Sequence, residues 1–236
     1  MQNIFAALRD VSTATLTTVL VARGLRNVWV RSASRVAGEQ KRRIVGPAFT
    51  LRFIPQREDI ATPAAWASPV STRAAIEEMS PGAIAVASAA GGITDAGIFG
   101  DILSLRMAVL GAVGLVTDGA IRDCAGVKDT GLPVWAAGVA APPSVASLVF
   151  AGWQEPIGCG GVAVFPGDII VADDDGVVVL PVALAPEVAA EAVEQEAFEN
   201  WVIKEVKKGA ALPGLYPPDA NTRARYRAEI NSRRES

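Results

Sequence analysis

The sequence of 236 residues contains no histidine. Without imidazole, Ser-His-Asp and Cys-His nucleophilic catalysis, histidine-ligated zinc and imidazole acid–base catalysis are all excluded. Cysteine is nearly absent as well, because Cys124 and Cys159 are too few for a disulfide framework or a thiolate zinc site. Any reaction must therefore use carboxylates, arginine, lysine, tyrosine, water or a cation held by oxygen ligands.

An excess of positive charge and a continuous membrane-spanning segment are also missing. The formal net charge is −3, so we expect no nucleic-acid partner, and we interpret the arginine-rich C-terminal segment as a solvated tail. The longest uncharged run, Thr130 to Gln154, is broken by Pro133, Pro142 and Pro143, which favours a buried strand and loop over a membrane span. No charged segment followed by an apolar run opens the chain, so we expect no secretion signal and a cytoplasmic location.

Half of the residues are hydrophobic, which is enough for one sizeable domain. A helix is predicted from Ser12, a suitable N-cap, to Arg23, with Gly24 ending it. Strands and helices then alternate, which predicts a parallel-rich sheet with helices packed outside it. The predicted strands are 42–55, 83–88, 112–117 and 133–137, the helices are 71–79 and 101–110, and 122–130 is a loop or a short helix.

The pattern changes after residue 144. Short β-branched runs punctuated by glycine, proline and aspartate predict antiparallel hairpins over 145–181. Residues 184–208 read as a helix with glutamates near its start and lysines near its end, and a final short helix follows. We therefore divide the chain into a core at 1–183 and a C-terminal helical extension at 184–236, which we expect to pack on a neighbouring subunit.

The most informative motif is Asp101 followed, after a gap of twenty residues, by the pair Arg122-Asp123. Asp101 begins a predicted helix, where an aspartate favours the N-cap and where the N–H groups of Ile102 and Leu103 can bind an anion. Arg122 and Asp123 follow a predicted buried strand, where α/β folds place ligands. The carboxylates suit a hard divalent cation and the guanidinium an anionic substrate, although an N-cap and a surface salt bridge would also explain these residues.

Other candidate groups have weaker support. The acidic run Asp173–Gly176 lacks the later ligands of a calcium loop and reads as a hairpin turn. Lys128 is the residue to consider for a Schiff-base mechanism, but no apolar run desolvates it. Cys124 lacks a partner base and suits packing. Arg52 and Arg57 are candidate contacts for a second anionic group, or else exposed charges at the end of a strand.

With these motifs the chain resembles the RraA-like family, which includes the 4-hydroxy-4-methyl-2-oxoglutarate/4-carboxy-4-hydroxy-2-oxoadipate aldolases and the regulators of ribonuclease E activity. The resemblance covers roughly residues 10–208 and is carried by the motif above and by the segments STATLTTVL, GDILSLR, GLVTDGAIRD, LPVWAAG and CGGVAVFPGDIIVADDDGVVVLP. It implies an α/β fold, a swivelling β/β/α-type sandwich. It also implies a homotrimer or homohexamer with active sites between subunits.

The resemblance further implies that Mg²⁺ or Mn²⁺ sits near Asp123, with Asp101 helping through bound water, and that Arg122 holds the oxo group of the substrate. The backbone at the start of the helix would receive the pyruvyl carboxylate, at Gly100, Ile102 and Leu103. The expected protein is a class II, metal-dependent lyase that cleaves a pyruvate-containing 2-oxo acid through a metal-stabilised enolate. Its substrate would be a 4-hydroxy-2-oxo acid or oxaloacetate.

One departure from the family pattern bears on the activity. Aldolases of this family often carry an acidic residue three positions after the Arg-Asp pair, where this chain has Gly126. Aldol cleavage could therefore be impaired while decarboxylation survives, unless Glu196 or Glu199 of a neighbouring subunit compensates. The alternative function is a non-catalytic regulator that binds an RNA-processing enzyme.

Overall fold

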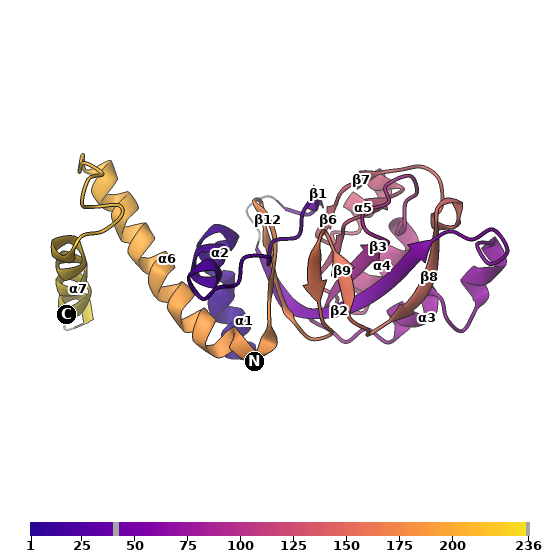
Figure 1. Ribbon diagram of the computed structural model, residues 1–236, viewed down its shortest axis with the longest axis horizontal. Coiled ribbons are helices and arrows are strands. Elements are labelled where there is room, and N and C mark those ends of the chain that lie inside the picture. Colours follow the sequence, from indigo (N-terminus) through magenta and orange to yellow (C-terminus); the bar gives the residue numbers. More distant parts are fainter. Residues whose placement is uncertain (40–42, 235–236) are drawn as a thin grey trace.

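In the computed structural model, which describes residues 1–39 and 43–234, the long strand β2 (Ile44–Pro55) organises the fold (Figure 1). Its residues Ala48–Phe53 pair in parallel with β3, its first residues pair antiparallel with β11, and its last residues pair antiparallel with β8. One strand thus joins the parallel and antiparallel parts of the sheet. The strand predicted at 42–55 is confirmed from Ile44 onward; Arg42 lies outside the described residues.

The central sheet has the strand order β1-β6-β4-β3-β2-β11-β12, with β8 also paired to β2. The pairs among β2, β3, β4 and β6 are parallel, as the alternation of strands and helices predicted, and the remaining pairs are antiparallel. The other strands span β1 (Ser34–Ala37), β3 (Ile84–Ala89), β4 (Gly114–Thr117), β6 (Val134–Ala136), β8 (Leu148–Trp153), β11 (Ile169–Asp173) and β12 (Gly176–Leu180).

Different layers cover the two faces of this sheet. In β3, Ala85 and Ala87 face one core and Ile84 and Val86 the other, because successive side chains of a strand point to opposite faces. The first core is closed by the helices α3 (Thr72–Glu77), α4 (Asp101–Val109) and α5 (Cys124–Asp129). The second is closed by the hairpin of β9 (Ile157–Cys159) and β10 (Val162–Val164), together with β11 and β12. The expected α/β sandwich is confirmed.

Several local predictions are confirmed in detail. Ser12 is the N-cap of α2 (Thr13–Ala22), and its side chain accepts a hydrogen bond from the N–H of Thr15. Gly24, at φ +86°, ends that helix with a hydrogen bond from the Leu25 N–H to the Leu20 carbonyl. The antiparallel hairpins are present as well, and Asp173 pairs with Gly176 across the turn between β11 and β12.

The C-terminal helices form an arm that extends from the body (Figure 1). The first half of α6 (Ala185–Lys207) packs on α1 (Gln2–Arg9) and α2, and its far half packs on α7 (Ala220–Arg234). Aromatic side chains join α6 and α7, at Phe198, Trp201 and Tyr226. Within the described residues, no single helix has the length and apolar character of a membrane span; only α1 and α2 together do, and these are bent by 113°.

Candidate functional site

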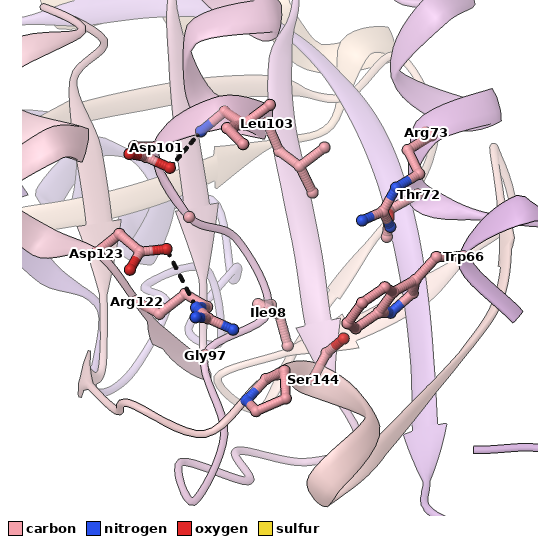
Figure 2. Close-up of a pocket in the computed structure, with 13 residues that line it drawn as sticks. Trp66, Thr72, Arg73, Gly97, Ile98, Asp101, Leu103, Arg122, Asp123 and Ser144 are labelled. Atoms are coloured by element: carbon pink, nitrogen blue, oxygen red, sulfur yellow. Dashed lines mark hydrogen bonds and ion pairs between the residues drawn. The ribbon is translucent and has the colours of Figure 1, made fainter. Parts of the chain in front are cut away.

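A cavity of about 240 Å³ lies where the start of α4 meets the segment after β5 (Ala120–Ile121) (Figure 2). The predicted Asp and Arg-Asp motif and the predicted anion-binding helix start all line it: Gly100, Asp101, Ile102, Leu103, Arg122 and Asp123. The other lining residues were not predicted: Trp66, Thr72, Arg73, Gly97, Ile98, Pro143 and Ser144. The structure thus brings the two halves of the motif together, and it adds a wall that the motif does not contain.

Backbone hydrogen bonds explain how residues twenty positions apart meet. The segment 97–100 runs alongside β5, where the Ile98 N–H donates to the Ala120 carbonyl and the Arg122 N–H donates to the Phe99 carbonyl, both at 2.9 Å. On its other side, β5 pairs in parallel with β7 (Gly138–Val139). This ladder of backbone hydrogen bonds holds the N-terminus of α4 beside the Arg-Asp pair.

Two glycines let the segments approach so closely. A Cβ atom on Gly97 would lie 2.6 Å from the Cβ atom of Arg122 and 2.7 Å from its backbone nitrogen. A Cβ atom on Gly100 would lie 2.5 Å from Oδ2 of Asp123. Since real Cβ atoms do not come so close to other atoms, a side chain at Gly97 would force its segment away from the backbone of Arg122, and a side chain at Gly100 would displace the Asp123 carboxylate. These glycines are part of the site's geometry, and among them only Gly100 was named from the sequence.

Asp123 has an uncommon backbone conformation. Its φ and ψ angles are 51° and 43°, in the left-handed region that few residues other than glycine and asparagine adopt. It occupies the N-cap of α5 without capping that helix through its side chain. Instead, its Oδ2 atom accepts a hydrogen bond from Nε of Arg122 at 3.1 Å. The Asp123 carboxylate thus lines the cavity and pairs with Arg122 instead of capping its own helix, in a backbone conformation that aspartate tolerates better than most residues.

Asp101 is placed one residue differently from the prediction. Gly100 is the N-cap of α4 and Asp101 is its first helical residue, so the expected capping role of Asp101 is wrong in position. The carboxylate still serves the first turn, because its Oδ1 atom accepts from the Ile102 N–H at 2.7 Å. An anion that reached this N–H would have to displace the Asp101 carboxylate. The Leu103 N–H has no carbonyl four residues back within the helix and can receive an anion directly.

The two aspartates supply carboxylate oxygens, the type of ligand that a small divalent cation such as Mg²⁺ prefers. No group of three or more His, Cys, Asp or Glu residues arranged for a metal occurs in the described part of the chain, so the cavity offers two carboxylates and no more. The described hydrogen bonds use Oδ2 of Asp123 and Oδ1 of Asp101, which leaves one oxygen on each. One or two carboxylates with the remaining positions filled by water or substrate is the usual environment of Mg²⁺.

Gly126 lies against Asp101 across the interface between α4 and α5. A Cβ atom at residue 126 would lie 2.8 Å from both Cβ and Oδ2 of Asp101. An acidic side chain at this position would therefore compete with Asp101 for the same space. The glycine that replaces the acidic residue of the family pattern thus leaves room for the Asp101 side chain.

The second wall of the cavity comes from parts of the chain that carry no recognisable motif. Trp66 belongs to the 3₁₀ helix η1 (Pro63–Ala67), Thr72 and Arg73 begin α3, and Ser144 begins the 3₁₀ helix η2 (Ser144–Ala146). The Arg73 guanidinium stacks over the Trp66 ring, with 5.0 Å between its Cζ atom and the ring centroid. Burial lowers the pKa of Arg73 from its ordinary value, yet an arginine stays charged at neutral pH.

Several residues proposed from the sequence lie elsewhere. Lys128, in the last turn of α5, lines a separate depression beside β1, so a Schiff base on this residue would not form in the cavity. Arg52 pairs with Glu155 at 3.0 Å and Arg57 pairs with Asp59 at 2.7 Å. Neither arginine lines the cavity of its own chain, which agrees with the alternative interpretation as charges near the end of a strand.

Glu196 and Glu199 contact α2 within the same chain. Oε2 of Glu196 accepts from the N–H and the hydroxyl of Ser12, both at 3.0 Å, and Oε2 of Glu199 accepts from the hydroxyl of Thr15 at 2.7 Å. Both carboxylates therefore help to fix α6 against the N-terminus of α2. Within one chain, neither of them lines the cavity.

The cysteines do not supply a nucleophile to the site. Cys159 is fully buried in the second core, and burial, reinforced by the nearby Asp118 carboxylate, raises the pKa of its thiol. Asp118 itself accepts hydrogen bonds from the N–H groups of Ala89 and Gly160, at 2.7 and 3.0 Å, and ties the ends of β3 and β9 together. Cys124 follows Asp123, but it is absent from the lining of the cavity.

Comparison with known proteins places the chain among relatives of two kinds. The family model Aldolase/RraA, described as RraA-like, matches residues 7–179. A protein of Halalkalibacterium halodurans named "Putative 4-hydroxy-4-methyl-2-oxoglutarate aldolase" is 34% identical over 157 residues, which are 66% of this chain and 69% of that protein.

Two solved structures share the fold over most of their length. Streptomyces coelicolor RraAS2, described as an unusual member of the RNase ES inhibitor RraA protein family, matches with a TM-score of 0.75 and 35% identity, over 85% of this chain and 96% of that chain. An uncharacterized protein from Pseudomonas syringae matches with a TM-score of 0.78 and 25% identity, over 92% and 98% of the two chains.

Proposed function

The chain belongs to the RraA-like family, and from this premise we propose that it is a divalent-metal-dependent lyase that acts on a pyruvate-containing 2-oxo acid. The reaction is cleavage of the C3–C4 bond of a 4-hydroxy-2-oxo acid or loss of CO₂ from oxaloacetate. The observation that carries the proposal is the convergence of Asp101, Arg122 and Asp123 on one cavity at the N-terminus of a helix. The aldolase name of the relative from Halalkalibacterium halodurans supports the same reaction class.

The residues of the cavity account for binding and orientation of the substrate. The N–H groups in the first turn of α4 and the positive end of its dipole receive the carboxylate at C1. The Arg122 guanidinium, which Asp123 holds by the 3.1 Å hydrogen bond, donates to the oxygen at C2. As the bond between C3 and C4 breaks, its electron pair moves into the C2 carbonyl. The guanidinium then faces the negative charge that develops on this oxygen.

A Mg²⁺ or Mn²⁺ ion held by Asp123 and Asp101 would act as a Lewis acid toward the 2-oxo group. With both carboxylates used in this way, no third carboxylate of the described residues lines the cavity to remove the proton of a 4-hydroxyl group. Decarboxylation requires no such base. We therefore expect turnover of oxaloacetate even where aldol cleavage is slow.

The test is a coupled assay of pyruvate release. Purified protein would be offered oxaloacetate, 4-hydroxy-2-oxoglutarate and 4-hydroxy-4-methyl-2-oxoglutarate, each with Mg²⁺, with Mn²⁺ and after treatment with EDTA. We expect pyruvate from at least one of them, loss of the activity in EDTA and its recovery on adding metal. Full activity in metal-free protein would refute the metal dependence. Absence of pyruvate under every condition would refute the lyase.

The second candidate function is a non-catalytic regulator of an RNA-processing enzyme. Its support is the likeness to RraAS2, which is described as a member of an RNase inhibitor family. The two functions differ in their dependence on Asp123, since a docking role does not need the carboxylate that pairs with Arg122 in the cavity. A regulator would show no turnover. Its partner would bind the Asp123→Ala variant as tightly as it binds the unchanged protein.

A further inference from the structure

We propose that Arg73, stacked on Trp66, is the specificity-determining residue that binds a second carboxylate of the substrate, so that the protein prefers 2-oxo diacids to 2-oxo monoacids. This inference rests on the proposed function, in which Arg122 and the start of α4 hold the 2-oxo acid end. Arg73 and Trp66 lie on the wall of the cavity that faces Arg122 and Asp123, and the Arg73 guanidinium points inward (Figure 2).

The charge of Arg73 is not used by a neighbouring carboxylate. The natural partner on its own helix is Glu77, four residues further along, but that carboxylate is held by both Nε and Nη2 of Arg106, at 2.9 and 2.6 Å. The adjacent Glu78 accepts a hydrogen bond from the Trp153 indole at 2.8 Å. Within residues 1–39 and 43–234, Arg73 forms no ion pair, and its described hydrogen bond is a long one, 3.4 Å, to the Thr72 hydroxyl.

The guanidinium also has an aromatic partner. Its Cζ atom lies over the Trp66 ring, 5.0 Å from the ring centroid, although Arg73 as a whole is exposed. A guanidinium held in this way presents two parallel N–H groups to a carboxylate. The Ser144 hydroxyl lines the same part of the cavity and can donate a further hydrogen bond.

The balance of charge in the cavity agrees with a doubly negative ligand. Asp101 and Asp123 contribute two negative charges and Arg122 and Arg73 contribute two positive ones, so these four side chains cancel. With the divalent cation of the proposed function, the site carries a net charge of about +2. A 2-oxo diacid neutralises this charge, whereas a monoacid leaves one positive charge without a partner. Without the positive charge of Arg73, the net charge of the site would be about +1, which a monoacid neutralises.

The experiment compares the binding of two ligands that cannot be cleaved and that differ at one carbon. 2-Oxoglutarate carries a carboxylate where 2-oxopentanoate carries a methyl group, and neither has a 4-hydroxyl group or a carboxylate next to C3. Their dissociation constants would be measured by calorimetry in one Mg²⁺-containing buffer. We expect the unchanged protein to bind 2-oxoglutarate about 10- to 100-fold more tightly, which is the usual effect of one hydrogen-bonded ion pair.

Arg73→Gln should remove most of this preference. Its affinity for 2-oxopentanoate should stay within about twofold of that of the unchanged protein, since only the diacid has a second carboxylate to pair with residue 73. Arg73→Lys keeps the charge but not the planar fork, so it should retain part of the preference. Arg57→Gln is the matched control. It makes the same change of net charge at a fully exposed arginine outside the cavity, and it should change neither affinity.

Equal weakening of both ligands by Arg73→Gln would show a purely structural role and overturn the proposal. So would a preference that survives Arg73→Gln, or a wild-type protein that does not distinguish the two ligands or binds neither. These readouts do not depend on turnover. Failure of the lyase proposal would appear separately, as absent pyruvate release from a protein that still prefers the diacid through Arg73.

Discussion

The two walls of the cavity are built in different ways. The wall that holds Asp101, Arg122 and Asp123 comes from two adjacent backbone segments, joined by a hydrogen-bonded ladder and by glycines that leave no room for a side chain. The wall that holds Trp66 and Arg73 comes from a 3₁₀ helix and the start of a short α-helix, and it depends on contacts between side chains.

In the proposed function, this difference separates the bond-breaking step from the choice of substrate. A wall fixed by backbone contacts holds its charged groups to the small tolerances that a bond-breaking step needs. A wall made of side chains can change its residues without changing the fold, which suits the recognition of a variable part of the substrate. Substitutions in the first wall should therefore lower turnover of every substrate, and substitutions in the second should change the preference among substrates.

The largest effect is expected at Asp123. Asn tolerates the left-handed backbone of this position, so Asp123→Asn removes the charge while keeping the local conformation. We expect the rate of pyruvate release to fall about 100- to 1,000-fold for all substrates, because the carboxylate both orients Arg122 and faces the cation. Asp129→Asn, at the exposed far end of the same helix, is the control and should retain normal rates. Near-normal turnover by Asp123→Asn would remove this residue from the site.

A smaller effect is expected from Gly100→Ala, which breaks the first wall without removing a charge. The backbone of Gly100 is accessible to alanine, at φ −114°, but the added Cβ atom would lie 2.5 Å from Oδ2 of Asp123. We expect turnover to fall about 10- to 100-fold, since displacement of a catalytic group by about 1 Å has effects of this size.

The matched variant for this test is Gly158→Ala. A Cβ atom on Gly158 meets no atom within 4 Å, so the substitution should leave activity unchanged. Circular dichroism and thermal unfolding of both variants would show that the fold is retained. Equal activity in Gly100→Ala and the unchanged protein would mean that the close contact between the segments does not matter for the reaction.

The smallest effect is expected at Trp66, where the second wall can be weakened without removing a charge. Trp66→Leu loses the stacking on Arg73, which contributes about 0.5–1 kcal/mol at exposed sites. The preference for 2-oxoglutarate over 2-oxopentanoate should therefore fall about two- to fivefold, while turnover with oxaloacetate changes little. Trp66→Phe retains an aromatic face, so its preference for 2-oxoglutarate should lie between those of the unchanged protein and Trp66→Leu. A loss of turnover as large as that of Asp123→Asn would contradict the division between the walls.

Much of the fold could be predicted because its signals are local. The strands around residues 84–89 and 114–117 are short apolar runs bounded by glycine or proline, and the caps at Ser12 and Gly24 depend on neighbours within four residues. The N-cap of α4 was predicted one residue away from its position in the structure. An aspartate and a glycine both suit an N-cap, and the ladder beside β5 decided in favour of Gly100.

Arg52 and Arg57, near the end of the strand predicted at 42–55, were the candidate contacts for a second anionic group, with exposed charges as the alternative. The structure gives each of them a nearby carboxylate and leaves Arg73 facing the cavity instead. No local signal could have shown this. It depends on Arg106, from another helix, binding the glutamate that would otherwise have paired with Arg73.

The sequence by itself determined which chemistry is possible here. A chain without histidine excludes imidazole chemistry, and its spaced Asp and Arg-Asp motif supplies carboxylates and a guanidinium instead. Tertiary structure decided which residues share the cavity, because pairing between segments and competition among charges act between residues distant in the chain. Arg73 and Arg52 are equally basic in the sequence, but the packing of α3 against α4 pairs Glu77 with Arg106 and leaves Arg73 without an ion pair among the described residues, whereas Arg52 pairs with Glu155.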